Sequence, residues 1–167
     1  IEYPISLMLD ASTRNFRDKK RIFCSLKNLV IITPSEWMAN WIQQSFFGDY
    51  PIKVVHNGIN LKLFSYWEPQ DTFYEKYSID RNKKILLGVA SVWDKRKGID
   101  DFMNLARELP EEYQIILVGL SKRQISALPH NVKGITRTEN VEELIRFYSA
   151  ADIFINPSVE ESFSLVT

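Results

Sequence analysis

A basic stretch in the middle of the sequence has the residue types of a phosphate-binding loop. Lys95, Arg96 and Lys97 follow the apolar run 85–89 and precede Gly98, where a helical pattern begins. A helix N-terminus offers free backbone N–H groups and the positive end of the helix dipole, and basic side chains add charge toward a phosphate. The alternative is a solvated basic turn, and spacing alone leaves both open. Neither GxGxxG nor GxxxxGKS/T is present, which disfavours a dehydrogenase or an NTPase.

Two carboxylates follow another apolar run, near the end of the chain. The run 153–156 is followed by Pro157-Ser158, a turn signal, and then by Glu160 and Glu161. Carboxylates that follow a strand are candidates for chemistry on a bound substrate. The competing interpretation is an acidic surface loop, and position alone does not decide between the two.

A third candidate segment follows the short apolar run 132–135. Its residues are Thr136, Arg137 and Thr138. Backbone groups here could contact a base, and Arg137 could bind a phosphate or stack on a ring. The alternative is a polar loop that caps the next helix.

These segments need a scaffold that brings the ends of several strands together. Apolar runs alternate with runs at helical spacing, which predicts parallel β-α-β units in an α/β fold. The carboxyl ends of the strands form the ligand crevice in such sheets. The predicted strands are 29–32, 53–55, 85–89, 114–118, 132–135 and 153–156, and the predicted helices are 34–46, 99–109 and 141–150.

Cap signals and apolar spacing support these helices. Thr33 and Glu36 form a capping box with Pro34 at the first helical position, and Asn140 with Glu143 forms a second cap. In the helix after Gly98, one apolar stripe predicts the face that packs on a sheet. It comprises Ile99, Phe102, Leu105, Ala106 and Leu109.

The composition is that of a globular chain. With 167 residues, 45% of them hydrophobic, it can form one domain or parts of two, and its 21 basic and 21 acidic residues disfavour nucleic acid as a partner. No apolar run approaches the roughly 18–20 residues of a membrane span. Cys24, the single cysteine, allows no internal disulfide and is expected to be a packed small hydrophobe, and two histidines are too few for a zinc cluster. We therefore predict a cytoplasmic protein.

The first thirty residues are strongly basic. Arg14, Arg17 and Arg21 share one helical face, with Phe16 and Phe23 behind it. Such a helix can lie on anionic lipid, so peripheral contact with the inner face of the membrane is a secondary hypothesis. A solvated charged face is the competing interpretation.

The stretch 57–80 breaks the alternation of strands and helices. Asn57-Gly58 is a turn signal, and Pro69 and several aromatic residues follow. We interpret 57–80 as a linker between the end of one domain, 1–56, and the beginning of another, 81–167. The chain opens at Ile1 without an initiator methionine, so we interpret it as a fragment, and we expect its unfinished sheets to favour self-association.

Four motifs follow one another along the chain. They are Thr33-Pro34-Ser35-Glu36, His56-Asn57-Gly58-Ile59-Asn60 with Phe64, Lys97-Gly98, and Asn156-Pro157-Ser158 with residues 160–165. In this order they resemble the retaining GT-B glycosyltransferases of the family-4, or group 1, type. The resemblance covers essentially the whole chain and implies two Rossmann-like domains, both incomplete here, the first for the acceptor and the second for a sugar nucleotide.

The resemblance also assigns roles to residues near the end of the chain. Glu161-Ser162-Phe163-Ser164 occupies the place of EGFG, the start of the family's Glu-x7-Glu signature. By that match Glu161 approaches the transferred sugar, and backbone amides of Phe163, Ser164 and Leu165 face the sugar and diphosphate. The second Glu, which holds the ribose, falls two residues beyond Thr167.

Lys97 matches the phosphate-binding lysine of the family's KG motif, with Gly98 after it. The family's arginine five residues before that lysine is Val92 here, and Arg96, or Ser91 if one residue is inserted, takes its place. Other departures are Ser162 and Ser164 for the two glycines of EGFG and Asn60 for a common aspartate at the hinge.

The resemblance implies transfer of a sugar from a nucleoside-diphosphate sugar, such as a UDP- or GDP-sugar, to a saccharide or lipid-linked acceptor. It further implies retention of anomeric configuration by front-face attack, in polysaccharide or glycolipid biosynthesis. No D-x-D pair is present, so we expect no metal and no other cofactor. Because the acceptor loops are absent, we expect the fragment alone to be weakly active or inactive.

Two other functions remain open. A GT-B sugar-nucleotide epimerase or phosphorylase would use the same fold with other catalytic groups. A non-catalytic nucleotide-binding or assembly module would transfer no sugar from any donor.

Overall fold

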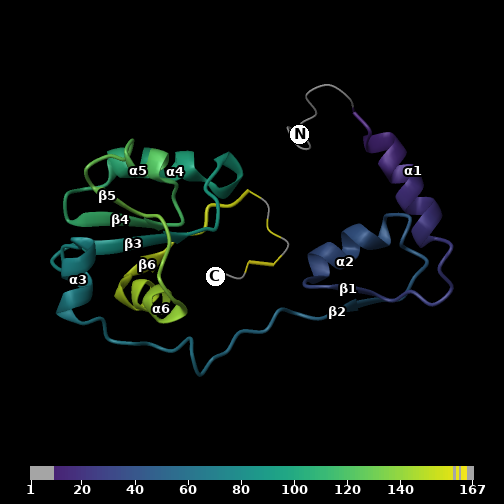
Figure 1. Ribbon diagram of the computed structural model, residues 1–167, viewed down its shortest axis with the longest axis horizontal. Coiled ribbons are helices and arrows are strands. Elements are labelled where there is room, and N and C mark those ends of the chain that lie inside the picture. Colours follow the sequence, from purple (N-terminus) through teal and green to yellow (C-terminus); the bar gives the residue numbers. More distant parts are fainter. Residues whose placement is uncertain (1–9, 160, 162, 165–167) are drawn as a thin grey trace. The chain divides into compact units, whose positions relative to one another are not determined.

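The computed structural model describes residues 10–159, 161, 163 and 164. The chain divides into two compact units, Ile1–Asn57 and Gly58–Thr167, each described here by itself. Figure 1 shows their helices and strands. The division of the chain into an acceptor part, a linker and a donor part stays a prediction.

The first unit contains one β-α-β element preceded by a basic helix. Strands β1 (Ile31–Thr33) and β2 (Ile52–Val54) are parallel, with Ile31 opposite Ile52, and helix α2 (Glu36–Gln43) connects them. This confirms the predicted parallel unit, with α2 shorter at both ends than predicted. Helix α1 (Ser12–Phe23) has no buried residue.

The predicted cap of α2 at Thr33 is wrong. Thr33 is the last residue of β1, its side chain is buried, and its carbonyl accepts a hydrogen bond from Val55 N–H at 2.9 Å. Ser35 is the N-cap instead, since its backbone is extended and its hydroxyl accepts from Met38 N–H at 3.3 Å. Because backbone pairing with β2 keeps Thr33 in strand β1, helix α2 begins only at Glu36.

Aromatic contacts attach α1 to the segment after α2. Phe16 packs edge-on against Phe46 at a centroid distance of 5.3 Å, and Phe23 packs against Phe47 at 5.6 Å. Cys24 is exposed at the end of α1, contrary to the expectation that it is packed. Within the described residues, no helix has both the length and the apolar character needed to cross a membrane.

The second unit is a four-stranded parallel sheet with helices on both faces. Its strand order is β5-β4-β3-β6. The strands are β3 (Lys84–Val89), β4 (Tyr113–Val118), β5 (Val132–Ile135) and β6 (Ile153–Phe154). The helices are α3 (Asp71–Tyr77), a short 3-10 helix η1 (Lys95–Lys97), α4 (Ile99–Glu108), α5 (Lys122–Ile125) and α6 (Val141–Ala150).

The order of the strands creates a switch point between β3 and β6. From β3 the chain winds outward through β4 to β5, and then α6 returns it to the other side of β3 as β6. The helices α4 and α5 therefore lie on one face of the sheet and α3 and α6 on the other (Figure 1). Ligands of such sheets bind at the carboxyl ends of the strands beside the switch point.

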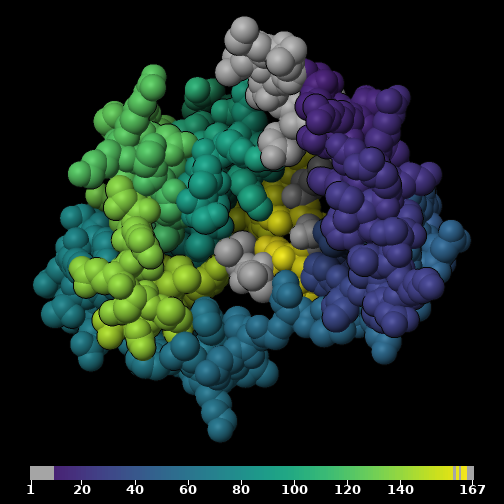
Figure 2. Space-filling view, turned by 45° about the vertical axis from the view of Figure 1, so that its right-hand side comes forward, coloured from purple at the N-terminus to yellow at the C-terminus, as the bar shows by residue number. Residues whose placement is uncertain are grey.

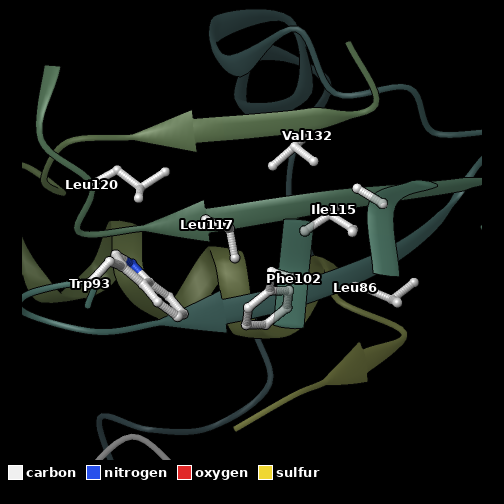
Figure 3. Close-up of a cluster of buried hydrophobic side chains, with 8 residues drawn as sticks. Leu86, Trp93, Phe102, Ile115, Leu117, Leu120 and Val132 are labelled. Atoms are coloured by element: carbon white, nitrogen blue, oxygen red, sulfur yellow. The ribbon is translucent and has the colours of Figure 1, made fainter. Parts of the chain in front are cut away.

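The α4 side of the core is built around two aromatic rings. Phe102, 1% exposed, meets Trp93 edge-on at a centroid distance of 5.4 Å, and Leu117 lies beside them (Figure 3). The indole N–H of Trp93 donates to the carbonyl of Val118 at 2.9 Å. The predicted apolar stripe of α4 is confirmed, with Phe102 at its centre and Leu105 partly buried at its margin.

On the other face, a buried carboxylate joins α3 to α6. Asn140 caps α6, as predicted, by accepting from Glu143 N–H at 2.8 Å. The Glu143 carboxylate accepts from Lys76 Nζ at 2.6 Å, from Glu139 N–H at 2.6 Å and from the Tyr77 hydroxyl. Burial raises the pKa of Glu143, but these hydrogen bonds outweigh it and the net pKa is lowered.

Candidate functional site

A pocket opens at the carboxyl ends of β3 and β6, beside the switch point of the sheet. Three segments line it, which are the end of β3 with the loop after it, η1, and the loop after β6. In Figure 2 yellow atoms from the C-terminal part of the chain are visible beside teal atoms of the second unit. The polar residues of the lining are Ser91, Lys97, Asn156, Ser158, Glu161 and Ser164.

Lys97 and Glu161 meet in this pocket although they lie 64 positions apart in the sequence. Lys97 Nζ donates to Glu161 Oε1, and the two side chains are 36% and 27% exposed. The hydrogen bond from Lys97 lowers the pKa of Glu161, with a smaller contribution from Ser158, while burial opposes the shift. The structure therefore joins in one ion pair the two residues that the resemblance assigned to the diphosphate and to the transferred sugar.

The turn around Asp94 aims Lys97 into the pocket and Arg96 away from it. Asp94 caps η1 by accepting from Lys97 N–H at 3.0 Å, and the Arg96 guanidinium donates to the same carboxylate at 3.1 Å. These hydrogen bonds lower the pKa of Asp94. Arg96 is not part of the pocket lining, so the structure does not bring it to Lys97 as a second phosphate ligand.

The loop after β6 is held by hydrogen bonds from Asn156. Its Oδ1 accepts from the Ser158 hydroxyl at 2.8 Å, and its Nδ2 donates to Ser164 Oγ at 3.3 Å. The loop is also attached to η1, because Val159 N–H donates to the carbonyl of Arg96 at 3.0 Å. Hydrogen bonds thus hold the loop on both sides of Glu161.

The other predicted donor-binding residues are distributed unevenly. Ser91 and Ser164 line the pocket, whereas the buried Gly98 and the half-buried Phe163 are not part of its lining. Leu165 lies outside the described residues. Arg137 and Thr138 follow β5, which β4 separates from β3, and neither lines the pocket.

Sequence reasoning named Asn156 and Ser158 only as part of a motif and gave them no place in the site. In the structure both line the pocket and hold its carboxylate-bearing loop. The spacing of these two residues could have identified them. Asn that follows a strand and precedes Ser by two positions is typical of a turn closed by the Asn side chain.

The pocket suits part of a ligand that carries negative charge and hydroxyl groups. Lys97 supplies a cation, and serine and asparagine side chains supply hydrogen bonds. Its volume is about 100 Å³, below the roughly 300–1,000 Å³ of complete ligand sites. In the part of the chain that the structure describes, no group of three or more His, Cys, Asp or Glu side chains is placed to hold a metal ion.

Comparison with known proteins identifies the family. A family model described as glycosyl transferases group 1 matches residues 83–167, the segment that contains both Lys97 and Glu161. The chain belongs to the group 1 glycosyl transferases. This confirms the resemblance drawn from the four motifs.

Two relatives of the chain have diacylglycerol in their names. The chain is 28% identical over 148 residues to the processive diacylglycerol alpha-glucosyltransferase of Acholeplasma laidlawii, covering 82% of this chain and 43% of the relative. It is 37% identical over 97 residues to the alpha-galactosylglucosyldiacylglycerol synthase of Streptococcus pneumoniae, covering 50% of this chain and 25% of the relative. The chain thus spans less than half the length of these relatives.

Solved structures confirm the predicted α/β fold of GT-B type for this group 1 chain. Sucrose-phosphate synthase from Thermosynechococcus elongatus has a TM-score of 0.69 at 21% identity, covering 99% of this chain and 43% of that one. HepE from Anabaena in complex with UDP has a TM-score of 0.68 at 19% identity, covering 93% and 45%. At these identities the likeness shows the fold alone.

Proposed function

We propose that the full-length protein transfers a sugar from a nucleoside-diphosphate sugar to a lipid or saccharide acceptor with retention of anomeric configuration. The proposal rests on one observation. Lys97 and Glu161 form an ion pair in the pocket at the switch point, and both lie in the segment matched by the group 1 family model. At this edge of a parallel sheet, the cation is suited to bind the phosphate side of a sugar-phosphate bond and the carboxylate is suited to bind the sugar side.

The chemistry assigns different tasks to the two residues. As the bond between the anomeric carbon and the diphosphate oxygen breaks, negative charge grows on the diphosphate and positive charge on the sugar. Lys97 and backbone N–H groups of the loop around Phe163 stabilise the diphosphate, and Glu161 orients the sugar. Ser91, Ser164 and Leu165 complete the contacts to the donor, and Arg137 and Thr138 lie where the base extends along the edge of the sheet.

Retention follows if the acceptor attacks on the face that the diphosphate leaves. The acceptor oxygen forms the new bond to the anomeric carbon, the carbon–diphosphate bond breaks, and the acceptor proton passes to the departing diphosphate oxygen. Lys97 provides the charge stabilisation in this scheme, so we propose that transfer requires no divalent metal.

The relatives indicate which substrates to test first. UDP is the ligand named for HepE, and diacylglycerol is part of the names of two relatives of this chain. We therefore propose a UDP-sugar donor and a diacylglycerol-type lipid acceptor as the leading pair, in glycolipid biosynthesis, with the acceptor met at the membrane surface.

The test uses the full-length protein with UDP-glucose, UDP-galactose and GDP-mannose, and with diacylglycerol in mixed micelles. We expect lipid-linked sugar with one of these donors, in EDTA as well as in magnesium, and NMR of the product shows an α linkage from an α donor. Lys97→Ala should lower kcat/KM by about 10²–10³-fold, the range for loss of one charge-stabilising group.

Lys95→Ala is the matched control, because Lys95 lies in the same 3-10 turn but outside the pocket lining. Equal losses in the two lysine variants contradict the role given to Lys97. Absence of transfer from every donor contradicts the proposed function and favours the non-catalytic module.

A further inference from the structure

The pocket contains one cation and one anion, and they neutralise each other. In the described part of the lining, Lys97 is the one basic side chain and Glu161 the one acidic side chain. Their ion pair leaves the pocket without net side-chain charge from these two groups. An incoming phosphate therefore meets Lys97 already bound to a carboxylate.

We propose that Glu161 occupies the phosphate position at Lys97 in the ligand-free protein, so that an incoming diphosphate binds by displacing the Glu161 carboxylate. The proposal rests on the proposed function, because it takes the ligand to be the diphosphate of a sugar nucleotide. It gives Glu161 a second role, that of a competitor for Lys97 before the sugar is bound.

The exposure of the pair makes this exchange physically feasible. Both side chains keep about a third of their surface in contact with solvent, at 36% and 27%. Ion pairs that are solvated to this degree are weak, so a ligand of higher charge can replace one partner. The diphosphate of a sugar nucleotide carries a negative charge on each of its phosphates and several acceptor oxygens, whereas the Glu161 carboxylate carries a single charge.

The loop keeps Glu161 in the pocket after it leaves Lys97. Asn156 Oδ1 accepts from the Ser158 hydroxyl at 2.8 Å and from the Ser158 N–H at 3.4 Å, and neither hydrogen bond involves the Glu161 carboxylate. The carboxylate can therefore turn from Lys97 without loss of the loop's own hydrogen bonds. Diphosphate binding in this way frees Glu161 for the sugar that arrives on the same ligand.

The cost of displacing Glu161 is the same for every anion. A diphosphate offsets this cost more readily than a single phosphate because it has more charge and more acceptors. We therefore expect inorganic pyrophosphate to bind much more tightly than orthophosphate in the wild type, and Glu161→Gln to tighten the binding of both by a similar factor.

Isothermal titration calorimetry on the full-length protein tests the proposal, with UDP, GDP, ADP, pyrophosphate and orthophosphate as probes. We expect Glu161→Gln to bind pyrophosphate and the preferred nucleoside diphosphate about three- to tenfold more tightly, the range for loss of a competing, partly exposed ion pair and of one repulsive charge. Glu108→Gln makes the same charge change outside the pocket lining and should leave both affinities unchanged.

Glu161→Asp keeps the test decisive if Glu161→Gln folds poorly. It draws the carboxylate back by one methylene and should also tighten pyrophosphate binding. Where Glu161→Gln folds, its effect should be smaller in a Lys97→Ala background, because only the repulsion between Glu161 and the ligand is then removed.

The outcomes separate this inference from the proposed function. Unchanged or weaker pyrophosphate binding by folded Glu161→Gln and Glu161→Asp overturns the inference, even if the wild type binds a nucleoside diphosphate and transfers sugar. An equal gain in Glu108→Gln also overturns it, since the effect is then long-range. If neither the wild type nor any Glu161 variant binds a diphosphate, the inference and the proposed function fall together.

Discussion

Gly98 and Pro157 approach each other so closely that no side chain fits at position 98. A Cβ atom built on Gly98 lies 2.4 Å from Pro157 Cγ, and the backbone of Gly98 has a φ of +74°. Gly98 directly follows Lys97, and Pro157 belongs to the loop that carries Glu161. The close packing of these two residues therefore sets the distance between the two halves of the candidate site.

Gly98→Ala is expected to strain this junction. The left-handed backbone disfavours alanine, and its methyl group pushes Pro157 away, so we expect a loss of about 1–3 kcal/mol in the free energy of unfolding. Diphosphate binding should weaken as well, because Asn156 and Ser158 move with Pro157. Urea denaturation and calorimetry measure the two effects.

Gly58→Ala is the control for this variant. A Cβ atom on Gly58 meets nothing within 4 Å, so stability and binding should stay near wild type. Wild-type stability in Gly98→Ala is inconsistent with the packing described here.

Trp93→Phe is expected to destabilise the second unit. The indole N–H that bonds Val118 is lost, and the smaller ring leaves space beside Phe102. We expect a cost of about 1–3 kcal/mol in the free energy of unfolding, measured by urea denaturation. Trp41→Phe, at a site where the tryptophan is 61% exposed, should change it by no more than about 0.5 kcal/mol. Equal effects in the two variants contradict the buried position of Trp93.

Glu143 is expected to make the free energy of unfolding depend on pH. Its pKa is lowered in the folded protein from an unfolded value near 4.5, because hydrogen bonds from Lys76, Tyr77 and Glu139 N–H outweigh burial. A lowered pKa contributes stability that is present above the unfolded value and is lost as pH falls through the folded value.

Unfolding followed between pH 3 and 7, in the wild type and in Glu143→Gln, measures this contribution. The variant should be less stable at pH 7, and its stability should fall less steeply below about pH 4.5. Parallel curves for the two proteins show that Glu143 has no such linkage.

Helix α1 is expected to bind anionic membranes through its basic face. None of its residues is buried, and Arg17 and Arg21 lie on the charged face. Vesicles of phosphatidylglycerol should retain the full-length protein in flotation experiments. Arg17→Glu with Arg21→Glu should weaken binding by about 30-fold or more, since each basic residue near such a surface contributes about 1 kcal/mol.

Lys122→Glu with Arg123→Glu makes the same charge change on α5, in the other unit. It is expected to leave vesicle binding largely intact. If both double variants lose binding equally, net charge and not α1 is responsible.

Local patterns in the sequence determined most of the secondary structure. Alternating apolar runs predicted the parallel strands, the Asn140 cap placed the start of α6, and helical spacing identified the buried face of α4. These features depend on residues within one turn or one strand of each other, so a local pattern contains the information. The cap at Thr33 was misplaced because a distant strand, β2, holds that residue in the ladder.

The motifs also located Lys97 and Glu161 at the ends of two strands and assigned the chain to its family. Only the tertiary structure decided that these residues form an ion pair, that Arg96 turns to Asp94, and that Arg137 lies beyond β4. The physical reason is the order of the strands. Since β6 returns to the free side of β3, residues 64 positions apart become neighbours, and no local pattern encodes that return.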